Sequence, residues 1–224
     1  MEKPKGYRLF HAVAIMSVAT LLISNTIAVK LFSIGSYSFP AGIIVFPVAY
    51  ILNDVLTEVY GYEKTRSVIW IGFIALGLMV LCYTIATYLT PASFWKDQES
   101  FERLFKQTPR IALASLLGYL VGSFSNSFVL SRMKVLTKGK RLWTRTIGST
   151  IIGEGADSFV FNFVAFAGIF ATSDLLTVVI SGFLFKVIFE IIATPLTYLI
   201  IGWLKRVENE DKFDVDVNYN PIKF

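Results

Sequence analysis

Long apolar stretches constrain this sequence more than any other feature. Each is long enough to cross a hydrocarbon core of about 30 Å, which takes roughly 20 helical residues. Six such stretches lie near residues 9–31, 39–59, 67–90, 111–130, 147–170 and 175–203. Because lipid offers no hydrogen-bond partners, each backbone must bond within its own segment. The pattern therefore predicts an all-α polytopic membrane protein with six transmembrane helices.

The composition supports a membrane protein and argues against several chemistries. Hydrophobic residues make up 54% of the chain and charged residues 17%, against about 45–50% and about 25% in soluble domains. Cys82 and His11 are the single residues of their types, so neither a disulfide within one chain nor a metal site built on histidine and cysteine is expected. A P-loop motif is absent. We expect no cofactor and no metal.

The distribution of basic residues predicts the orientation. If the N-terminus is inside, the inner segments carry fifteen Lys and Arg residues and the outer segments carry four. This bias places both termini in the cytoplasm, with the chain in the cell (inner) membrane. The basic run 131–145 is then a topology anchor at anionic headgroups rather than a nucleic-acid site. Residues 1–206 form the expected transmembrane domain, and 207–224 a solvated, polar cytoplasmic tail.

The order of the spans indicates a 3+3 inverted repeat, because the two halves would start on opposite sides of the membrane. In such folds the site lies at interrupted helices in corresponding positions. The middle span of the first half carries Pro40, Gly42 and Pro47. The middle span of the second half carries glycines at 148, 153 and 155. We therefore expect both middle helices to be broken.

Between spans three and four, segment 91–110 predicts an amphipathic helix on the outer interface, acting as a brace or a gating lid.

Ionisable residues within the spans are the main functional signal. At about 1.5 Å per residue, Asp157 and Lys186 both lie roughly 15 Å deep, on consecutive antiparallel helices. Asp54 and Glu190 both lie about 21 Å from the outer face, with Glu154 near the same plane. These three acids are expected to converge on one cavity. Further polar side chains at membrane depth are Asn25, Asn53, Asn126 and Asn162, whereas Glu58 lies near enough to the inner surface to be solvated.

The charges of this group do not balance. A carboxylate in hydrocarbon costs several kcal/mol, so each needs a reason to be there. One interpretation is a buried ion pair of Lys186 with Glu190 or Asp157 that only fixes helix packing. That pair leaves a surplus, since four acids face one lysine. The remaining acids must be protonated, pair with an ion or meet a ligand, and a substrate path is our preferred interpretation.

Four sequence blocks resemble a known family. They are NDVLTEVYGY (53–62), RIALASLLGYLVGSFSNSFVLSRMK (110–134), RTIGSTIIGEGADSFVF (145–161) and FKVIFEIIATPLTY (185–198). Together they resemble the YhhQ-type queuosine precursor transporters, also called the vitamin uptake transporter (VUT) family. The family pattern falls on Asp54, Glu58, Tyr60, Gly61, Arg110, Ser115, Tyr119, Ser149, Thr150, Gly153, Asp157, Lys186 and Pro195. Departures are Glu154, where an amide is expected, and Asn126, where an aspartate is expected.

The resemblance implies import of a deazapurine that is a precursor of the tRNA nucleoside queuosine. The substrates it implies are 7-cyano-7-deazaguanine, 7-aminomethyl-7-deazaguanine and queuine. We expect alternating access around a midplane site, with one acid available to carry a coupling proton. Asp157 or Glu154 would accept the guanine-like edge, Asp54 would add a polar contact, and Lys186 would contact a carbonyl. The candidate substrate-binding residues are Asp157, Glu154, Asp54, Lys186, Glu190, Asn126, Asn53, Asn162, Tyr119 and Asn25.

Two other functions stay open at this point. One is a substrate-binding membrane subunit of an energy-coupling-factor vitamin importer, which needs a separate ATP-driven module. The other is an intramembrane aspartyl protease using Asp54 and Asp157, although GEGAD is one residue longer than the GxGD spacing of such enzymes. The partners expected for the preferred reading are the deazapurine and the lipid bilayer. The small residues of 115–123 would also permit a homodimer.

Overall fold

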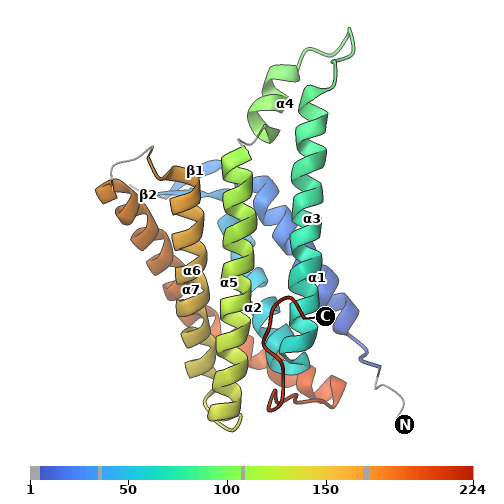
Figure 1. The fold of residues 1–224 in the computed structure, drawn as a ribbon, viewed down its shortest axis with the longest axis vertical. Coiled ribbons are helices and arrows are strands. Elements are labelled where there is room, and N and C mark those ends of the chain that lie inside the picture. Colours follow the sequence, from blue (N-terminus) through green and yellow to red (C-terminus); the bar gives the residue numbers. More distant parts are fainter. Residues whose placement is uncertain (1–5, 35–36, 107–108, 169–171, 224) are drawn as a thin grey trace.

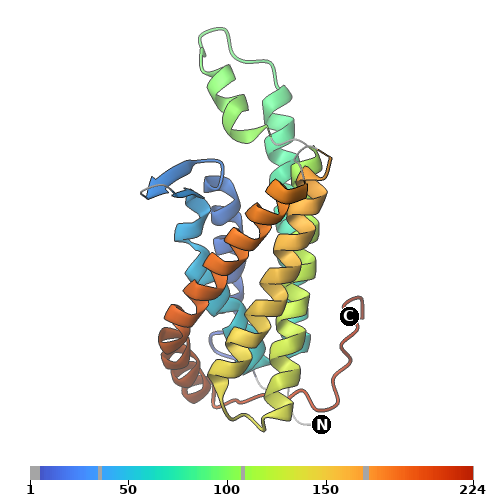
Figure 2. The same cartoon turned by 90° about the vertical axis from the view of Figure 1, so that its left-hand side faces the viewer.

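The computed structural model describes residues 6–34, 37–106, 109–168 and 172–223, which form an elongated helical bundle (Figure 1). Its helices are α1 (Phe10–Ile27), α2 (Phe46–Val55), α3 (Tyr62–Tyr88), α4 (Gln98–Phe105), α5 (Pro109–Leu136), α6 (Leu142–Phe166) and α7 (Thr172–Glu208). Helices α3, α5 and α6 run side by side along the long axis, and α7 crosses α6 obliquely (Figure 2). A helix lies within each of the six predicted spans, which confirms the all-α polytopic architecture.

Length and hydropathy alone identify four membrane-crossing candidates within the described residues. They are Phe10–Ile27, Tyr62–Tyr88, Gln98–Leu136 and Phe183–Glu208. Helix α6 has 25 residues and so reaches about 38 Å, enough to cross a bilayer, but it carries Glu154 and Asp157. Helix α2 has only 10 residues. Hydropathy and length therefore miss two helices, α6 because it carries two acids and α2 because it is short.

The middle segment of the first half is interrupted, as predicted. Strands β1 (Leu31–Ile34) and β2 (Tyr37–Pro40) form an antiparallel hairpin, which is the one departure from helix among the described elements. A 3-10 turn, Ala41–Ile44, follows it, and α2 then begins with Pro47 in its first turn. Proline is tolerated there because the first N–H groups of a helix have no partner. A π-helical turn, Leu56–Tyr60, ends the segment.

The second predicted interruption is wrong, because α6 is continuous from residue 142 to residue 166. Gly153 serves close packing against α5 instead. A Cβ atom on Gly153 would lie 2.6 Å from the Asn126 Cβ atom and 2.9 Å from the Gly122 carbonyl oxygen of α5. Gly118 and Gly122 of the small-residue stretch 115–123 pack on α6 within the chain, and the possible homodimer stays a prediction. The inverted repeat stays a prediction.

Both long connections between the predicted spans, 91–110 and 131–146, contain helical residues. Helix α4 lies in segment 91–110, which confirms the predicted helix there, and its place at a membrane surface stays a prediction. The basic segment 131–146 is mostly helical, because α5 continues to Leu136 and α6 begins at Leu142. The turn between them uses positive φ angles at Lys138, Gly139 and Arg141.

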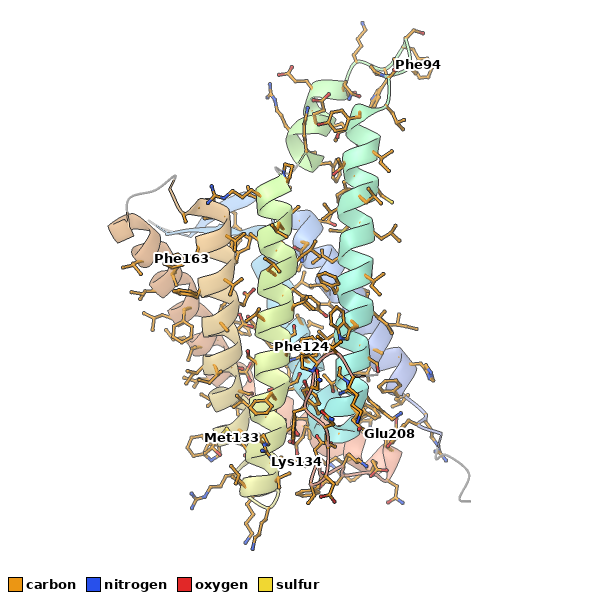
Figure 3. The ribbon with its side chains drawn as sticks, viewed as in Figure 1. Phe94, Phe124, Met133, Lys134, Phe163 and Glu208 are labelled. Carbon is orange, nitrogen blue, oxygen red and sulfur yellow. The ribbon has the colours of Figure 1, made fainter. Side chains whose placement is uncertain are left out.

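A buried charge network closes the end of the bundle that carries both chain termini. Glu58 is fully buried at 0% exposure, so the expectation that water solvates it is wrong. Arg145 donates two hydrogen bonds to its carboxylate, at 2.8 and 2.7 Å, and Lys205 donates a third at 2.7 Å. Lys134 lies 3.5 Å from the same carboxylate. Figure 3 shows Lys134 at this end, far from Phe94 at the other.

The C-terminal tail docks on this network through Asp211 and Asp214, while most side chains of residues 211–221 stay exposed, as expected for a solvated tail. Asp211 forms ion pairs with Lys134 at 2.6 Å and Lys205 at 2.8 Å. Asp214 accepts hydrogen bonds from the Tyr62 backbone N–H and the Ser131 hydroxyl. Further contacts run from Arg66 to the carbonyls of Asn218 and Asn220, and from Trp70 to the carbonyl of Pro221.

The start of α1 is fastened to the end of α7. The backbone N–H groups of Arg8 and Leu9 donate to the Glu208 carboxylate at 2.9 and 2.7 Å, and the Tyr60 hydroxyl donates to it at 2.9 Å. The start of α1 and the end of α7 therefore lie at one end of the bundle, as the six-span arrangement requires. Residues 1–5, with two of the basic residues that predict orientation, lie outside the described part.

Replacing Glu58 with glutamine should strongly destabilise the protein. Three cations would lose a buried carboxylate, and breaking a buried pair by removing one partner costs about 3–5 kcal/mol. The free energy of unfolding, from denaturant titration in detergent micelles, measures the effect. Glu63→Gln is the matched control, because Glu63 is exposed and surface changes stay within about 0.5 kcal/mol. Equal stability of the two variants would contradict the role assigned to the network.

The docking of the tail should weaken in acid. Burial acts to raise the pKa of Asp211, but hydrogen bonds and charge from Lys134 and Lys205 outweigh it and hold the pKa below its usual range. The contribution of this carboxylate is therefore present above the unfolded-state pKa and is lost as pH falls through the folded-state pKa. The hydrogen-exchange protection factors of residues 211–221, which are corrected for the intrinsic pH dependence of exchange, should fall over that acidic range. Asp211→Asn should exchange fast already at neutral pH, and a pH response unchanged by that substitution would rule the explanation out.

Candidate substrate site

Lys186 of α7 is held between two carboxylates of α6. Its ammonium donates to Glu154 Oε2 and to Asp157 Oδ2, each at 2.8 Å, and lies 3.4 Å from the Ser158 hydroxyl. Glu154 and Asp157 are three residues apart, so both project from one face of α6. The contact confirms that Asp157 and Lys186 share one level of the bundle. The site therefore contains one cation and two anions.

These three side chains line a cavity of about 320 Å³ inside the bundle. Lys186, Glu154 and Asp157 retain 18%, 13% and 28% exposure, so their charged ends are not sealed in a dry ion pair. The cavity wall is built from α1, α2, α3, α5, α6 and α7. Its size is at the small end of the range of about 300–1,000 Å³ for ligand pockets. The space suits a compact molecule.

Most of the predicted site residues lie on this wall. The seven that line the cavity are Asn25, Asn53, Tyr119, Asn126, Glu154, Asp157 and Lys186. Sequence reasoning missed Tyr50 and Phe161, which also line it. The Tyr50 hydroxyl interacts with Glu154. Its position four residues before Asp54, on the same face of α2, was the signal that could have identified it.

Three predicted residues lie behind the wall rather than on it. Asp54 is 1% exposed and accepts a hydrogen bond of 3.0 Å from the Asn126 side chain. Glu190 is also 1% exposed. Asn162 is buried and donates to the Ser158 carbonyl at 2.7 Å. Of the three acids expected to converge on one cavity, only Glu154 lines it.

The cavity is closed toward the end that carries the termini. Leu56 and Val68 line the cavity and also belong to the main apolar cluster of the bundle. The other buried members of that cluster are Ile51, Val55, Val59, Tyr60, Leu142, Ile201 and Leu204. The Glu58 network and the docked tail lie at the same end. Toward the opposite end the lining reaches Ala28, just beyond α1, and Ser115 in the second turn of α5.

The geometry does not support paired aspartates. Aspartyl proteases use two carboxylates about 3 Å apart that share one proton. Here Asp157 is paired with Lys186, and Asp54 is bonded to Asn126 behind the cavity wall. The two aspartates have different partners on different sides of that wall. The arrangement is that of a binding cavity.

A polytopic α-helical bundle that encloses a small charged cavity defines a membrane protein of the small-molecule carrier class. A family model described as "Putative vitamin uptake transporter" matches residues 40–200, and the chain belongs to this family. It is 30% identical to a "Probable queuosine precursor transporter" of Bacillus subtilis (strain 168), over 78% of this chain and 77% of the relative. These proteins are named as transporters and not as enzymes.

Two further relatives carry related names. A "Probable queuosine precursor transporter" of Haemophilus influenzae is 28% identical over 62% of this chain and 59% of its own length. The "Queuosine precursor transporter" of Escherichia coli (strain K12) is 24% identical over 82% of this chain and 79% of its own length. No solved structure matches the chain. The resemblance to the VUT family is thereby confirmed.

Gly153→Ala should destabilise the contact between α5 and α6. The added methyl group would meet backbone atoms of Gly122 and Asn126, which cannot move without separating the helices. Overpacking of this kind costs about 1–3 kcal/mol, measurable as a lower free energy of unfolding in detergent. Gly77→Ala of α3 is the matched control, because its added Cβ atom would meet nothing within 4 Å. If the two variants have the same free energy of unfolding, the explanation that close packing of α5 on α6 requires glycine at position 153 is refuted.

Proposed function

We propose that this protein imports a queuosine precursor across the cell membrane. The observation that carries the proposal is the position of Lys186, held between Glu154 and Asp157 on the wall of the cavity. The names of the relatives supply the substrate class. The substrates that fit it are 7-cyano-7-deazaguanine, 7-aminomethyl-7-deazaguanine and queuine.

The chemistry of these bases matches the charged groups. A guanine-like edge presents a ring N–H beside an amino group, and one carboxylate accepts both in a bidentate arrangement. Asp157, the most exposed of the three charged groups, is suited to that role. The Lys186 ammonium can donate to the neighbouring ring carbonyl. Because two acids face one lysine here, Glu154 still balances Lys186 when Asp157 turns to the base.

The cavity also offers flat surfaces for a heterocycle. Tyr50, Tyr119 and Phe161 contribute aromatic side chains to its wall. Stacking of a base on an aromatic ring contributes about 1–3 kcal/mol in nucleic-acid sites, whatever the base. Specificity then comes from the carboxylates and from the amides of Asn25, Asn53 and Asn126. Such a division between sequence-tolerant stacking and directional hydrogen bonds favours a planar base over a sugar or an amino acid.

Transport would proceed by alternating access. The bias of basic residues supports a cytoplasmic position for the end of the bundle where α1 begins and α7 ends. The apolar cluster and the Glu58 network close that end, so the cavity would load from outside. Import then requires these contacts to separate while the opposite end closes. We include proton coupling in this mechanism, since the acids outnumber the available cation.

Asp157→Asn should reduce substrate affinity by about 10- to 100-fold, because hydrogen bonds to a charged group contribute about 1.5–3 kcal/mol. Uptake of radiolabelled 7-cyano-7-deazaguanine by the purified chain in liposomes measures the loss, with insertion checked by protein content. Asp97→Asn is the matched control, because Asp97 is exposed in the connection before α4 and should transport normally.

Three outcomes of this experiment decide between the functions. Normal uptake by Asp157→Asn would refute the site. No uptake by the wild-type chain alone, restored by an added ATP-driven module, would favour the energy-coupling-factor subunit. No substrate binding under either condition would refute the proposed function.

A further inference from the structure

Glu190 is a buried carboxylate without a counter-charge. It lies on α7 one turn beyond Lys186, is 1% exposed, and neither carboxylate oxygen has a hydrogen-bond partner among the described residues. The nearby Thr194 hydroxyl donates to the Glu190 backbone carbonyl and not to its side chain. A charged carboxylate in this state would be desolvated and uncompensated, which costs far more than a surface charge.

Asp54 is a second acid in the same condition. It is 1% exposed, and only one of its carboxylate oxygens is bonded, to the Asn126 side chain. The other oxygen has no partner within the described part of the chain. Asp54 belongs to α2, which packs on α7, and its carboxylate interacts electrostatically with that of Glu190. Two unpaired acids therefore lie near one another behind the cavity wall.

The surrounding cations are already engaged. Lys186, on the same helix as Glu190, is shared by Glu154 and Asp157 of α6 at 2.8 Å each. Arg145, the cation that acts on Asp54 from the terminal end, is bound through two nitrogens to Glu58. Glu154 and Glu58 add negative charge near Glu190 and Asp54 respectively. Within the described part of the chain, the charged groups that act on the pair are thus other acids and a cation bound to its own carboxylate.

We propose that Glu190 and Asp54 form a proton-binding site of the carrier, separate from the substrate site and coupled to it through Lys186. A proton on the pair removes one negative charge and supplies an O–H donor beside three carboxylate oxygens that have no hydrogen-bond partner among the described residues. A metal ion is a poor alternative, since it takes several oxygen ligands. The described residues contain no group of three or more His, Cys, Asp or Glu side chains that could hold one. The inference rests on the proposed function and names the ion that drives it.

The coupling follows from competition for one ammonium group. Lys186 and Glu190 are four residues apart and lie on the same face of α7. When Glu190 is neutral, Lys186 remains with Glu154 and Asp157, and the site is set to bind substrate. When Glu190 gives its proton to water on the other side, its carboxylate competes for Lys186 and draws it away from Asp157. One proton thus enters with each substrate, and the carboxylate is regenerated for the next cycle.

The test uses the full chain in liposomes with 7-cyano-7-deazaguanine, a neutral base that carries no charge itself. An acidic exterior should drive accumulation of about tenfold per pH unit for one proton per substrate. An internal pH dye should report acidification that depends on the substrate. Glu190→Gln should lose both signals, so that its uptake no longer changes with external pH. Glu63→Gln, an exposed glutamate replaced in the same way, should match the wild type.

Further variants separate the possible results. Asp54→Asn should also lose substrate-dependent acidification, and it decides the question if Glu190→Gln inserts poorly. Glu190→Asp keeps a titratable carboxylate and should keep a pH response. If the wild-type chain does not move the base at all, the proposed function fails. If it moves the base without proton movement, or if Glu190→Gln and Asp54→Asn both keep gradient-driven accumulation, the proton site is refuted and the proposed function stands.

Discussion

The contact of Lys186 with Glu154 and Asp157 is the interaction on which the rest of the structure depends. It joins α6 to α7 at mid-height, and because two acids share one lysine it leaves a net negative charge in the bundle. Such a charge is tolerable only beside water or a ligand. The cavity, its amide-rich wall and the close packing of α5 on α6 are the features that keep this place both accessible and separated from lipid.

Two buried acids of this bundle, Glu58 and Glu190, have opposite electrostatic surroundings. Glu58 is surrounded by Arg145, Lys205 and Lys134, so its charge is more than compensated and it holds helix ends together. Glu190 is equally buried and has no such partner among the described residues. The first arrangement is a structural network, and the second is difficult to explain by stability alone. This contrast separates residues that hold the fold from the residues to which we assign a role in transport.

Sequence reasoning succeeded for features that follow from the regular geometry of an α-helix. A fixed rise per residue places Asp157 and Lys186 at one level, and the ion pair confirms it. Sequence reasoning failed for features that depend on which other helix packs against a residue. The solvation expected for Glu58 followed from its depth, but cations more than 75 residues away along the chain bury it. Gly153 of α6 was expected to interrupt the helix, and only the approach of α5 shows that it serves packing.

The tail shows the same limit, since its polarity does not reveal where it docks. Its partners Tyr62 and Arg66 lie 152 residues earlier in the chain, and Lys134 lies 77 residues earlier.

Helix α7 connects this closed end of the bundle to the charged cavity. Helix α7 carries Lys186 at the cavity and Lys205 in the Glu58 network, which 19 residues place about 28 Å apart. Pro195 lies between them inside the helix. A proline removes one backbone hydrogen bond and makes a bend there less costly. A change in the partners of Lys186 can therefore reach Lys205 by bending one helix, without unfolding either end of it.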